Sequence, residues 1–451
     1  MSVTISQLNN GLQIVTDTMP GVETVALGLW FKVGARYEKP EHSGMAHFLE
    51  HLLFKGTARR SAFAISEEIE AKGGYLNAYT SRESTAFYAR MLSKDTALGM
   101  DVLADILQFS ALEDEDIERE RAVILQEIAQ AEDAPDDVVF TDFQAQAFAG
   151  QGLGQSVLGS QQTVGQIDRA AALDFWRYHY RPDKAILVAS GGVDHDDITR
   201  QAEALFWPDR AQRGPREMPA AALYTGGVRL RERSLEQVHT VLGFEGAPVT
   251  EARYFASAVL ATLLGGGASS RLFQEVRECR GLAYHVGAHT SGYADTGLFS
   301  VYAGTGQEAE AELLSVVIDE FRRLVEEPIP EEEVERARAQ IRTSFLMARE
   351  STSSRAEDAA QQMLVYGIPR SVGDLIGQLD AVDAEALRAE AELMLRSPLT
   401  LSAIGPLQET EALHQLSQRL EPYSRSHSAA APAAESGQEP DRRSQPDSAV
   451  A

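Results

Sequence analysis

The feature that most constrains the fold of this 451-residue chain is a weak internal repeat with a spacing of 211 positions. Residues 52–57 (LLFKGT) correspond to residues 263–268 (LLGGGA), and in both halves a helical pattern, a glycine and two alternating segments follow. Alternation of apolar and polar residues is typical of half-buried antiparallel strands. Long helical patterns come later in each half, over residues 114–131 and 331–347. We therefore predict an α+β protein with two similar domains, each a mostly antiparallel mixed sheet with helices packed on one face.

Local composition predicts the domain boundaries. Residues 207–227 contain three prolines and three glycines without a clear period, which is typical of a linker. We place the linker at residues 213–227, between an N-terminal domain (1–212) and a C-terminal domain (228–423). Residues 424–451 contain no aromatic residue and one large aliphatic residue, Val450, so we expect a disordered tail.

Composition also excludes several classes of protein. The 41 Lys and Arg residues against 67 Asp and Glu residues give a net charge of −26, so we expect no nucleic-acid partner. This charge either attracts basic partners or simply maintains solubility. A single cysteine, Cys279, excludes a disulfide framework. The N-terminal segment lacks the pattern of a signal peptide, and the apolar run over residues 25–31 is too short to span a bilayer, so we expect a cytoplasmic protein without a membrane segment.

His47, Glu50 and His51 form the strongest chemical signal, in the segment SGMAHFLEHLLF. The segment is typical of a helix with Ser43 as its N-cap. The two histidines are four residues apart, so both imidazoles share one helix face and can bind one ion. Two imidazoles leave positions on zinc for a third protein ligand and a water, from which an adjacent carboxylate can take a proton. The alternative is a partly buried polar helix face that binds no metal.

A third metal ligand should be an acidic residue from elsewhere in the chain. Glu120 and Glu127 are seven residues apart in a predicted helix, so they lie on one face. That face is predicted to point inward because it also carries apolar residues: Val123, Ile124 and Ala131. A buried carboxylate needs a partner. The alternative partners are Arg119 and Arg121, but both are predicted to point away from this face, which favours a metal.

Four segments occur in order along the chain: GMAHFLEHLLFKGT, GGYLNAYTSRESTAFYARM, ERERAVILQEI and SSRLFQEVRECRGLAYHVGA. Together they resemble the pitrilysin/insulinase family of zinc peptidases, and most of all its processing-peptidase branch, with the mitochondrial processing peptidases and their bacterial relatives. The resemblance covers about residues 1 to 423. It implies two domains that close around a central cleft, and the activity of a zinc metalloendopeptidase.

The resemblance also implies a metal site in the N-terminal domain. The family's zinc ligands are the two histidines of the motif, here His47 and His51, and a glutamate about 76 residues further on, here Glu127. Its supporting glutamate corresponds to Glu120, which would orient a ligand. The glutamate of the motif corresponds to Glu50, the general base.

Substrate-contacting residues are implied in both domains. Asn77 and Ala78 correspond to the family's edge strand, which pairs with the substrate backbone by strand addition. Arg277 and Tyr284 correspond to an arginine and a tyrosine that contact the substrate or the tetrahedral oxyanion. Without the resemblance, these two residues would be interpreted as a surface charge and a half-buried strand aromatic.

The second half lacks a metal motif of its own. At the spacing of 211, the positions of His47, Glu50 and His51 are occupied by other residues: Ala258, Ala261 and Thr262. We therefore expect one zinc ion per chain and short or unfolded peptide substrates, and the charge of −26 favours basic peptides among them. The chain would act as a homodimer or as a heterodimer with a related subunit. The alternative function is a non-catalytic, peptide-binding scaffold subunit of a processing complex.

Overall fold

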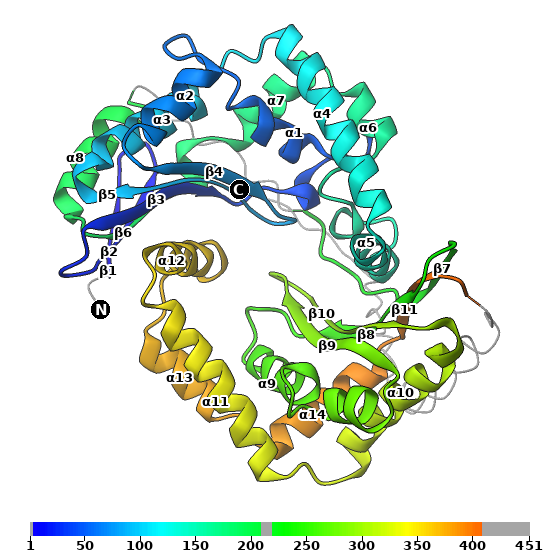
Figure 1. Cartoon of the computed structure of the whole chain (residues 1–451). Coiled ribbons are helices and arrows are strands. Elements are labelled where there is room, and N and C mark those ends of the chain that lie inside the picture. The colour runs from blue at the N-terminus through cyan, green and yellow to red at the C-terminus, as the bar shows by residue number, and fades with distance from the viewer. Residues whose placement is uncertain (1–2, 209–218, 408–451) are drawn as a thin grey trace, which may run out of the picture.

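The computed structural model describes residues 3–208 and 219–407 and contains two β-sheets that face each other (Figure 1). Most helices of each half lie on the outer side of that half's sheet (Figure 1). The predicted tail over residues 424–451 and the first six residues of the predicted linker lie outside the described residues. Within the described residues, no helix is both long enough and apolar enough to cross a bilayer.

The first sheet has six strands in the order β1-β2-β6-β3-β5-β4. Strands β2 and β6 are parallel, and every other pair is antiparallel. Strand β4 pairs antiparallel with β5, as the alternating pattern predicted. Among the described residues β5 is its only partner, so β4 lies at one edge of the sheet, as the family resemblance implied. The strands are β1 (Val3–Gln7), β2 (Gln13–Thr18), β3 (Thr24–Phe31), β4 (Tyr75–Thr80), β5 (Thr85–Leu92) and β6 (Ala185–Gly191).

The second sheet repeats the topology of the first. Its strand order is β7-β11-β8-β10-β9, in which each label is five higher than its counterpart in β2-β6-β3-β5-β4. The parallel pair recurs as β7 and β11. Two similar α+β domains are therefore confirmed. The strands are β7 (Gly227–Glu232), β8 (Val238–Gly246), β9 (Ala283–Gly292), β10 (Gly297–Thr305) and β11 (Thr400–Gly405).

The helices of each half bury one apolar face against its sheet, which forms two main cores. The first half has α1 (Met45–Leu52), α2 (Ala62–Glu70), α3 (Thr96–Phe109), α4 (Asp114–Asp133), α5 (Pro135–Ala147), α6 (Gln161–Gln166), α7 (Arg169–His179) and α8 (His195–Leu205). The second half has α9 (Arg253–Gly265), α10 (Glu310–Glu326), α11 (Glu331–Ala348), α12 (Thr352–Tyr366), α13 (Val372–Asp380) and α14 (Ala384–Arg396). Short helical turns are η1 (Ala35–Tyr37), η2 (Pro40–His42), η3 (Ser93–Asp95), η4 (Gly152–Gly154), η5 (Pro182–Lys184), η7 (Gln307–Ala309) and the π-helical η6 (Phe273–Cys279).

Two helices cross between the halves and add a layer that the sequence did not predict. Helix α5 of the first half packs on β7, β8 and β11 of the second sheet, and α12 of the second half packs on β2, β3 and β6 of the first (Figure 1). The contacts of α12 bury the apolar inner face of the first sheet, including Trp30 and Val188. Each half therefore covers part of the other half's sheet, which fixes how the two domains face each other.

Ion pairs and hydrogen bonds reinforce the contact between the halves. Arg355 of α12 forms a two-pronged ion pair with Asp17 of β2, with N–O distances of 2.5 and 2.6 Å, and Asp17 is almost fully buried. Arg36 pairs with Asp295 of the second half, also through two contacts, at 2.5 and 2.7 Å. Buried two-pronged pairs of this kind fix geometry as well as contributing energy.

Candidate metal centre

Helix α1 carries the motif, and its N-terminus is capped differently from the sequence prediction. The N-cap is Gly44, with a φ of 96° that favours glycine, and Ser43 makes no side-chain cap. The carboxylate of Glu38 accepts instead from the backbone N–H groups of Gly44 and Ala46, both at 2.7 Å. A buried carboxylate at the N-terminus of a helix satisfies two unpaired backbone donors and interacts favourably with the positive end of the helix dipole.

The buried face of α1 determines where the motif residues point. Its apolar residues pack into the first core, and the three polar motif residues lie half-buried on the other side. The neighbouring helix α4 packs against α1 and supplies Glu120 and Glu127. Ile124 of α4 is buried as predicted, but Val123 is 37% exposed. The buried face of α4 is therefore narrower than the sequence suggested.

The structure brings His47, His51 and Glu127 together. Glu127 Oε2 lies 3.7 Å from His47 Nε2 and 3.6 Å from His51 Nε2, and the three candidate ligand atoms all lie within 4.8 Å of one another. Zinc bonds of about 2.0–2.2 Å in a tetrahedron place ligand atoms about 3.3–3.6 Å apart. Glu127 Oε2 is buried and has no hydrogen-bond partner among the described residues. The three residues therefore fit a zinc ion, and they are the only such group among the described residues.

Glu120 contacts His51 at Nδ1, the ring nitrogen that does not face Glu127. Its Oε2 lies 3.2 Å from His51 Nδ1, and its Oε1 lies 2.9 Å from Lys55 Nζ. A carboxylate that accepts from Nδ1–H leaves Nε2 of the same ring free to bind a metal. Lys55 was missed by the sequence analysis, because it lies in the turn after the end of α1 at Leu52, where helical spacing no longer applies. It compensates the charge of Glu120, which is only 3% exposed.

The arginines considered as alternative partners do not contact either glutamate. Arg119 pairs with Asp116 and Glu115 on the exposed surface. Arg121 pairs with Glu118 and donates to backbone carbonyl groups of residues 164 and 167. Both side chains therefore point away from the metal-ligand group, as the helix geometry predicted.

Glu50 is placed beside the group by a contact with the edge strand β4. Its Oε2 accepts from the hydroxyl of Thr80 at 2.6 Å. Burial raises the pKa of Glu50, while the hydrogen bond from Thr80 and the nearby His51 oppose this rise. Burial also lowers the pKa of His47 to about 4, which favours the neutral, metal-binding form of its imidazole. Thr80 is a second residue that the sequence analysis missed.

Asn77 and Ala78 lie in β4 at the edge of the first sheet, as expected. Asn77 is exposed, and its side chain donates to the hydroxyl of Tyr75 at 2.6 Å. The backbone N–H of Ala78 donates to Asn77 Oδ1. The outer side of β4 has no neighbouring strand among the described residues, so its backbone is open to an added one except at the N–H of Ala78, which already donates to Asn77.

Arg277 and Tyr284 are brought together in the second half. Arg277 lies in η6 and donates to the backbone carbonyl of Tyr284 at 3.1 Å, and its guanidinium lies 4.5 Å from the centre of the Tyr284 ring. Tyr284 is 78% exposed in β9, which is the edge strand of the second sheet. The contacts of these two residues are with each other and with neighbours in their own half, so a role at the metal site stays a prediction.

The counterpart of α1 in the second half is α9. The positions that correspond to the motif, Ala258, Ala261 and Thr262, lie in this helix, and none of them supplies an imidazole or a carboxylate. The metal-ligand group is therefore confined to the first half.

Comparisons with known proteins agree with this asymmetry. Residues 13–161 match the family described as Insulinase (Peptidase family M16), and residues 166–341 match the domain described as Peptidase M16 inactive domain. An uncharacterized zinc protease of Streptomyces coelicolor is 41% identical over 90% of both chains. A probable mitochondrial-processing peptidase subunit beta of Arabidopsis thaliana is 36% identical, over 90% of this chain and 78% of the relative.

Solved structures show the same fold. A protease from Helicobacter pylori superposes with a TM-score of 0.82 at 20% identity, over 90% of this chain and 99% of that one. A chain of complex III2 from Candida albicans also gives a TM-score of 0.82 at 20% identity, over 93% and 100% of the two chains. The two matched domains and the similarity to these relatives show that this chain belongs to the insulinase (M16) family of zinc peptidases.

Proposed function

We propose that the chain is a zinc metalloendopeptidase that hydrolyses short or unfolded peptides and holds one zinc ion. The observation that supports this most directly is the convergence of His47, His51 and Glu127 with a fourth residue, Glu50, held beside them by Thr80. A binding protein would not require a carboxylate in this position, because Glu50 is outside the ligand group.

The chain's own residues supply positioning and proton transfer. Zinc, when bound by His47, His51 and Glu127, lowers the pKa of a coordinated water to about 7 and polarises a carbonyl group. Glu50 takes the proton of the attacking water and then passes it to the leaving amine. Glu120, compensated by Lys55, holds the His51 ring in the tautomer that presents Nε2 to the metal.

The substrate would bind as an added strand along β4. Main-chain hydrogen bonds near Asn77 and Ala78 would hold any extended peptide without reading its sequence. This favours short or unfolded segments over folded proteins, whose backbones are already paired. We keep Arg277 and Tyr284 as proposed contacts from the second half, where Tyr284 is exposed and free to approach a bound peptide.

We propose the domain boundaries, the location and the assembly of the chain as well. The domain boundaries are 1–212 and 228–423, the location is the cytoplasm, and the assembly is a homodimer or a heterodimer with a related subunit.

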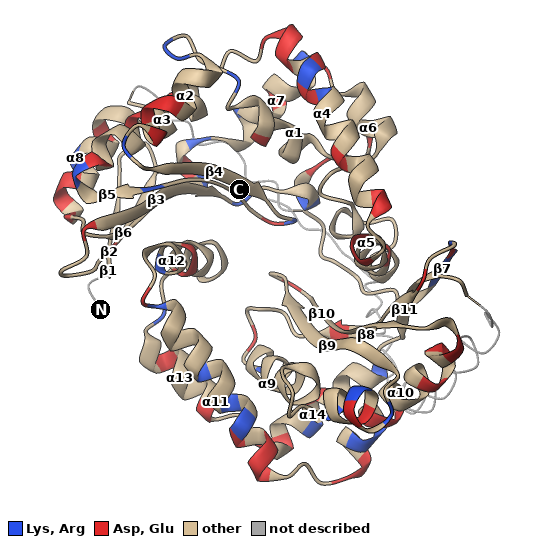
Figure 2. Ribbon diagram, viewed as in Figure 1, with Lys and Arg blue, Asp and Glu red and all other residues tan. Residues whose placement is uncertain are grey.

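Most Asp and Glu residues lie on helices, whereas the strands of both sheets carry few (Figure 2). Any preference for basic peptides would therefore come from the overall field of a chain with charge −26.

The test is the substitution Glu50→Gln, with Glu67→Gln on the exposed side of α2 as the matched control. Glu50→Gln should retain zinc and lose peptide hydrolysis by at least about 10²–10⁴-fold, the contribution of a positioned general base. Glu67→Gln should change neither property. A parent chain that binds about one zinc but never cleaves a peptide library would favour the scaffold function. Hydrolysis by Glu50→Gln near the parent rate would disprove the role of Glu50.

A further inference from the structure

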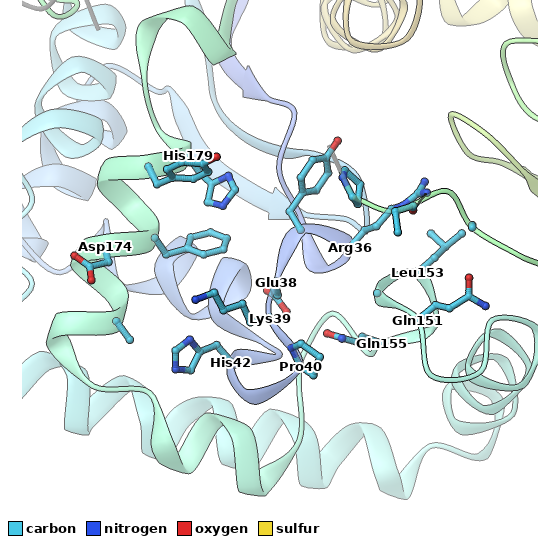
Figure 3. Close-up of a pocket in the computed structure, with 18 of the residues that line it drawn as sticks. Arg36, Glu38, Lys39, Pro40, His42, Gln151, Leu153, Gln155, Asp174 and His179 are labelled. Carbon is cyan, nitrogen blue, oxygen red and sulfur yellow. Dashed lines mark hydrogen bonds between the residues drawn. The ribbon is translucent and has the colours of Figure 1, made fainter. Parts of the chain in front are cut away.

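A second candidate site lies in the first half, in a pocket of about 970 Å³ whose lining includes none of the metal-site residues. Its walls come from the segment 36–42, the loop 150–155, helix α7 and residues 219–222 at the junction with the second half (Figure 3). Pockets of this volume are the size that proteins use for small molecules. Nothing in the proposed peptidase chemistry uses it.

One wall of the pocket is aromatic. Phe175 and Tyr178 of α7 lie 4.3 and 4.8 Å, between ring centres, from His179, and Tyr37 approaches the same imidazole at 6.3 Å. His179 is only 8% exposed, and burial lowers its pKa to about 3, so the imidazole is neutral. Tyr37 and Tyr178 stand at 77° and 83° to the His179 ring, and Phe175 is tilted by 41°. The wall therefore presents the edges and faces of several rings, against which an aromatic group can pack.

The walls of the pocket contain two buried polar atoms without a hydrogen-bond partner among the described residues. His179 Nδ1 makes no hydrogen bond to any described residue, and the same holds for the buried Oε1 of Gln155 on another wall. Figure 3 shows the His179 ring among the residues that line the pocket. Buried polar atoms are normally satisfied, so an unpaired donor or acceptor here indicates a polar group of a ligand or water as its partner.

The charge of the pocket is opposite to that of the chain. Lys39 and Arg177 line it and form no ion pair with any described residue, whereas Arg36 is neutralised by Glu83 and Asp295. Of the acidic lining residues, Glu38 is occupied by the N-terminus of α1, which leaves Asp174 as the exposed carboxylate. In a chain with a charge of −26, two unpaired cations beside an aromatic wall favour an anionic ligand.

We propose that this pocket binds a small amphipathic anion, with an aromatic body against the α7 wall and one carboxylate, sulfonate or phosphate group that is attracted by Lys39 and Arg177. Such a ligand would also touch Glu38, which caps the helix of the metal ligands, and Arg36, which bonds to the carbonyl of Ala220 and to Asp295. Occupancy would therefore stabilise the junction between the halves.

The probe is 8-anilinonaphthalene-1-sulfonate, and its uncharged counterpart N-phenyl-1-naphthylamine reports the contribution of the anion. Fluorescence titration of the full chain should show saturable binding of the sulfonate, with the uncharged dye at least about tenfold weaker, the loss expected of one charge-assisted hydrogen bond. Saturation should also raise the Tm, because the ligand binds the folded state. Equal affinities for the two dyes would overturn the proposal.

Variants locate the probe. Lys39→Gln and Arg177→Gln should each weaken sulfonate binding about tenfold, and Asp174→Asn should strengthen it because a repelling carboxylate is removed. Lys72→Gln, an exposed lysine of the same half that does not line the pocket, is the matched control. All four positions are on the surface, so the variants should fold. Unchanged affinity in Lys39→Gln and Arg177→Gln, or an equal loss in Lys72→Gln, would place the dye elsewhere and refute the site.

Discussion

Two glutamates of α4 should separate metal affinity from folding stability. In Glu127→Gln, the carboxylate that lies 3.6–3.7 Å from both imidazoles is replaced by a neutral amide. In Glu120→Gln, the carboxylate that contacts His51 Nδ1 and Lys55 Nζ is replaced in the same way. Glu118→Gln, on the same helix but exposed, is the matched control.

The expected magnitudes follow from these contacts. Zinc sites with four ligands bind with about 10–16 kcal/mol, so one ligand contributes about 2.5–4 kcal/mol, or roughly 10²–10³-fold in affinity. Glu127→Gln should lose about this much. Glu120→Gln should lose about 10–100-fold, because it only orients His51.

Folding stability without zinc should show the reverse order. Glu120 is 3% exposed and makes two polar contacts, so Glu120→Gln should lower the free energy of unfolding by about 1–3 kcal/mol. Glu127 Oε2 has no hydrogen bond to lose, so Glu127→Gln should leave the metal-free stability nearly unchanged.

The assay is a zinc titration against a competing chelator, paired with urea unfolding of the metal-free proteins. Glu118→Gln should match the parent in both measurements. If Glu127→Gln retains zinc as well as Glu118→Gln does, Glu127 is not a ligand. If Glu120→Gln loses more zinc affinity than Glu127→Gln while keeping its stability, the roles of the two residues are exchanged.

Three further predictions concern the base, the helix cap and the substrate. Thr80→Val removes a hydrogen bond that lowers the pKa of Glu50, so the pKa of Glu50 should rise. The acid limb of the pH profile of kcat/KM should then move to higher pH. An unmoved limb would show that Glu50 does not control it. In Glu38→Gln a single amide oxygen replaces the two carboxylate oxygens that accept from the N–H groups of Gly44 and Ala46. Urea unfolding should show a free energy of unfolding that is lower by about 1–3 kcal/mol. Glu41→Gln, at an exposed position, is the control and should leave this free energy unchanged. Quenched-fluorescent peptides flanked by Lys and Arg should be cleaved faster than peptides flanked by Asp and Glu. The difference should shrink between 0.1 M and 1 M salt, because the Debye length falls from about 10 Å to about 3 Å. Equal kcat/KM values at low salt would show that charge has no part in choosing substrates.

The sequence by itself determined the features that depend on local periodicity. The spacing of His47 and His51 places both on one side of any helix. The alternating segments around residues 75–92 and 283–305 pair as antiparallel strands, as predicted. The expectation that they are half-buried is wrong for β10 and for the first part of β5, which are buried on both faces. The repeat at 211 positions predicted the shared topology because the same order of elements folds in the same way. Glu120 and Glu127 were identified as a pair for the same reason, since seven residues are two helical turns.

Only the tertiary structure decided which distant residues meet. Glu38 caps α1 in place of the adjacent Ser43, and Thr80 reaches Glu50 across 30 positions of sequence. Lys55 balances Glu120, and α5 and α12 each cover the other half's sheet. Periodicity describes only the face on which a side chain lies. The partner across that face is set by how helices and sheets pack, where a buried polar atom takes whichever complementary group the fold brings within about 3 Å.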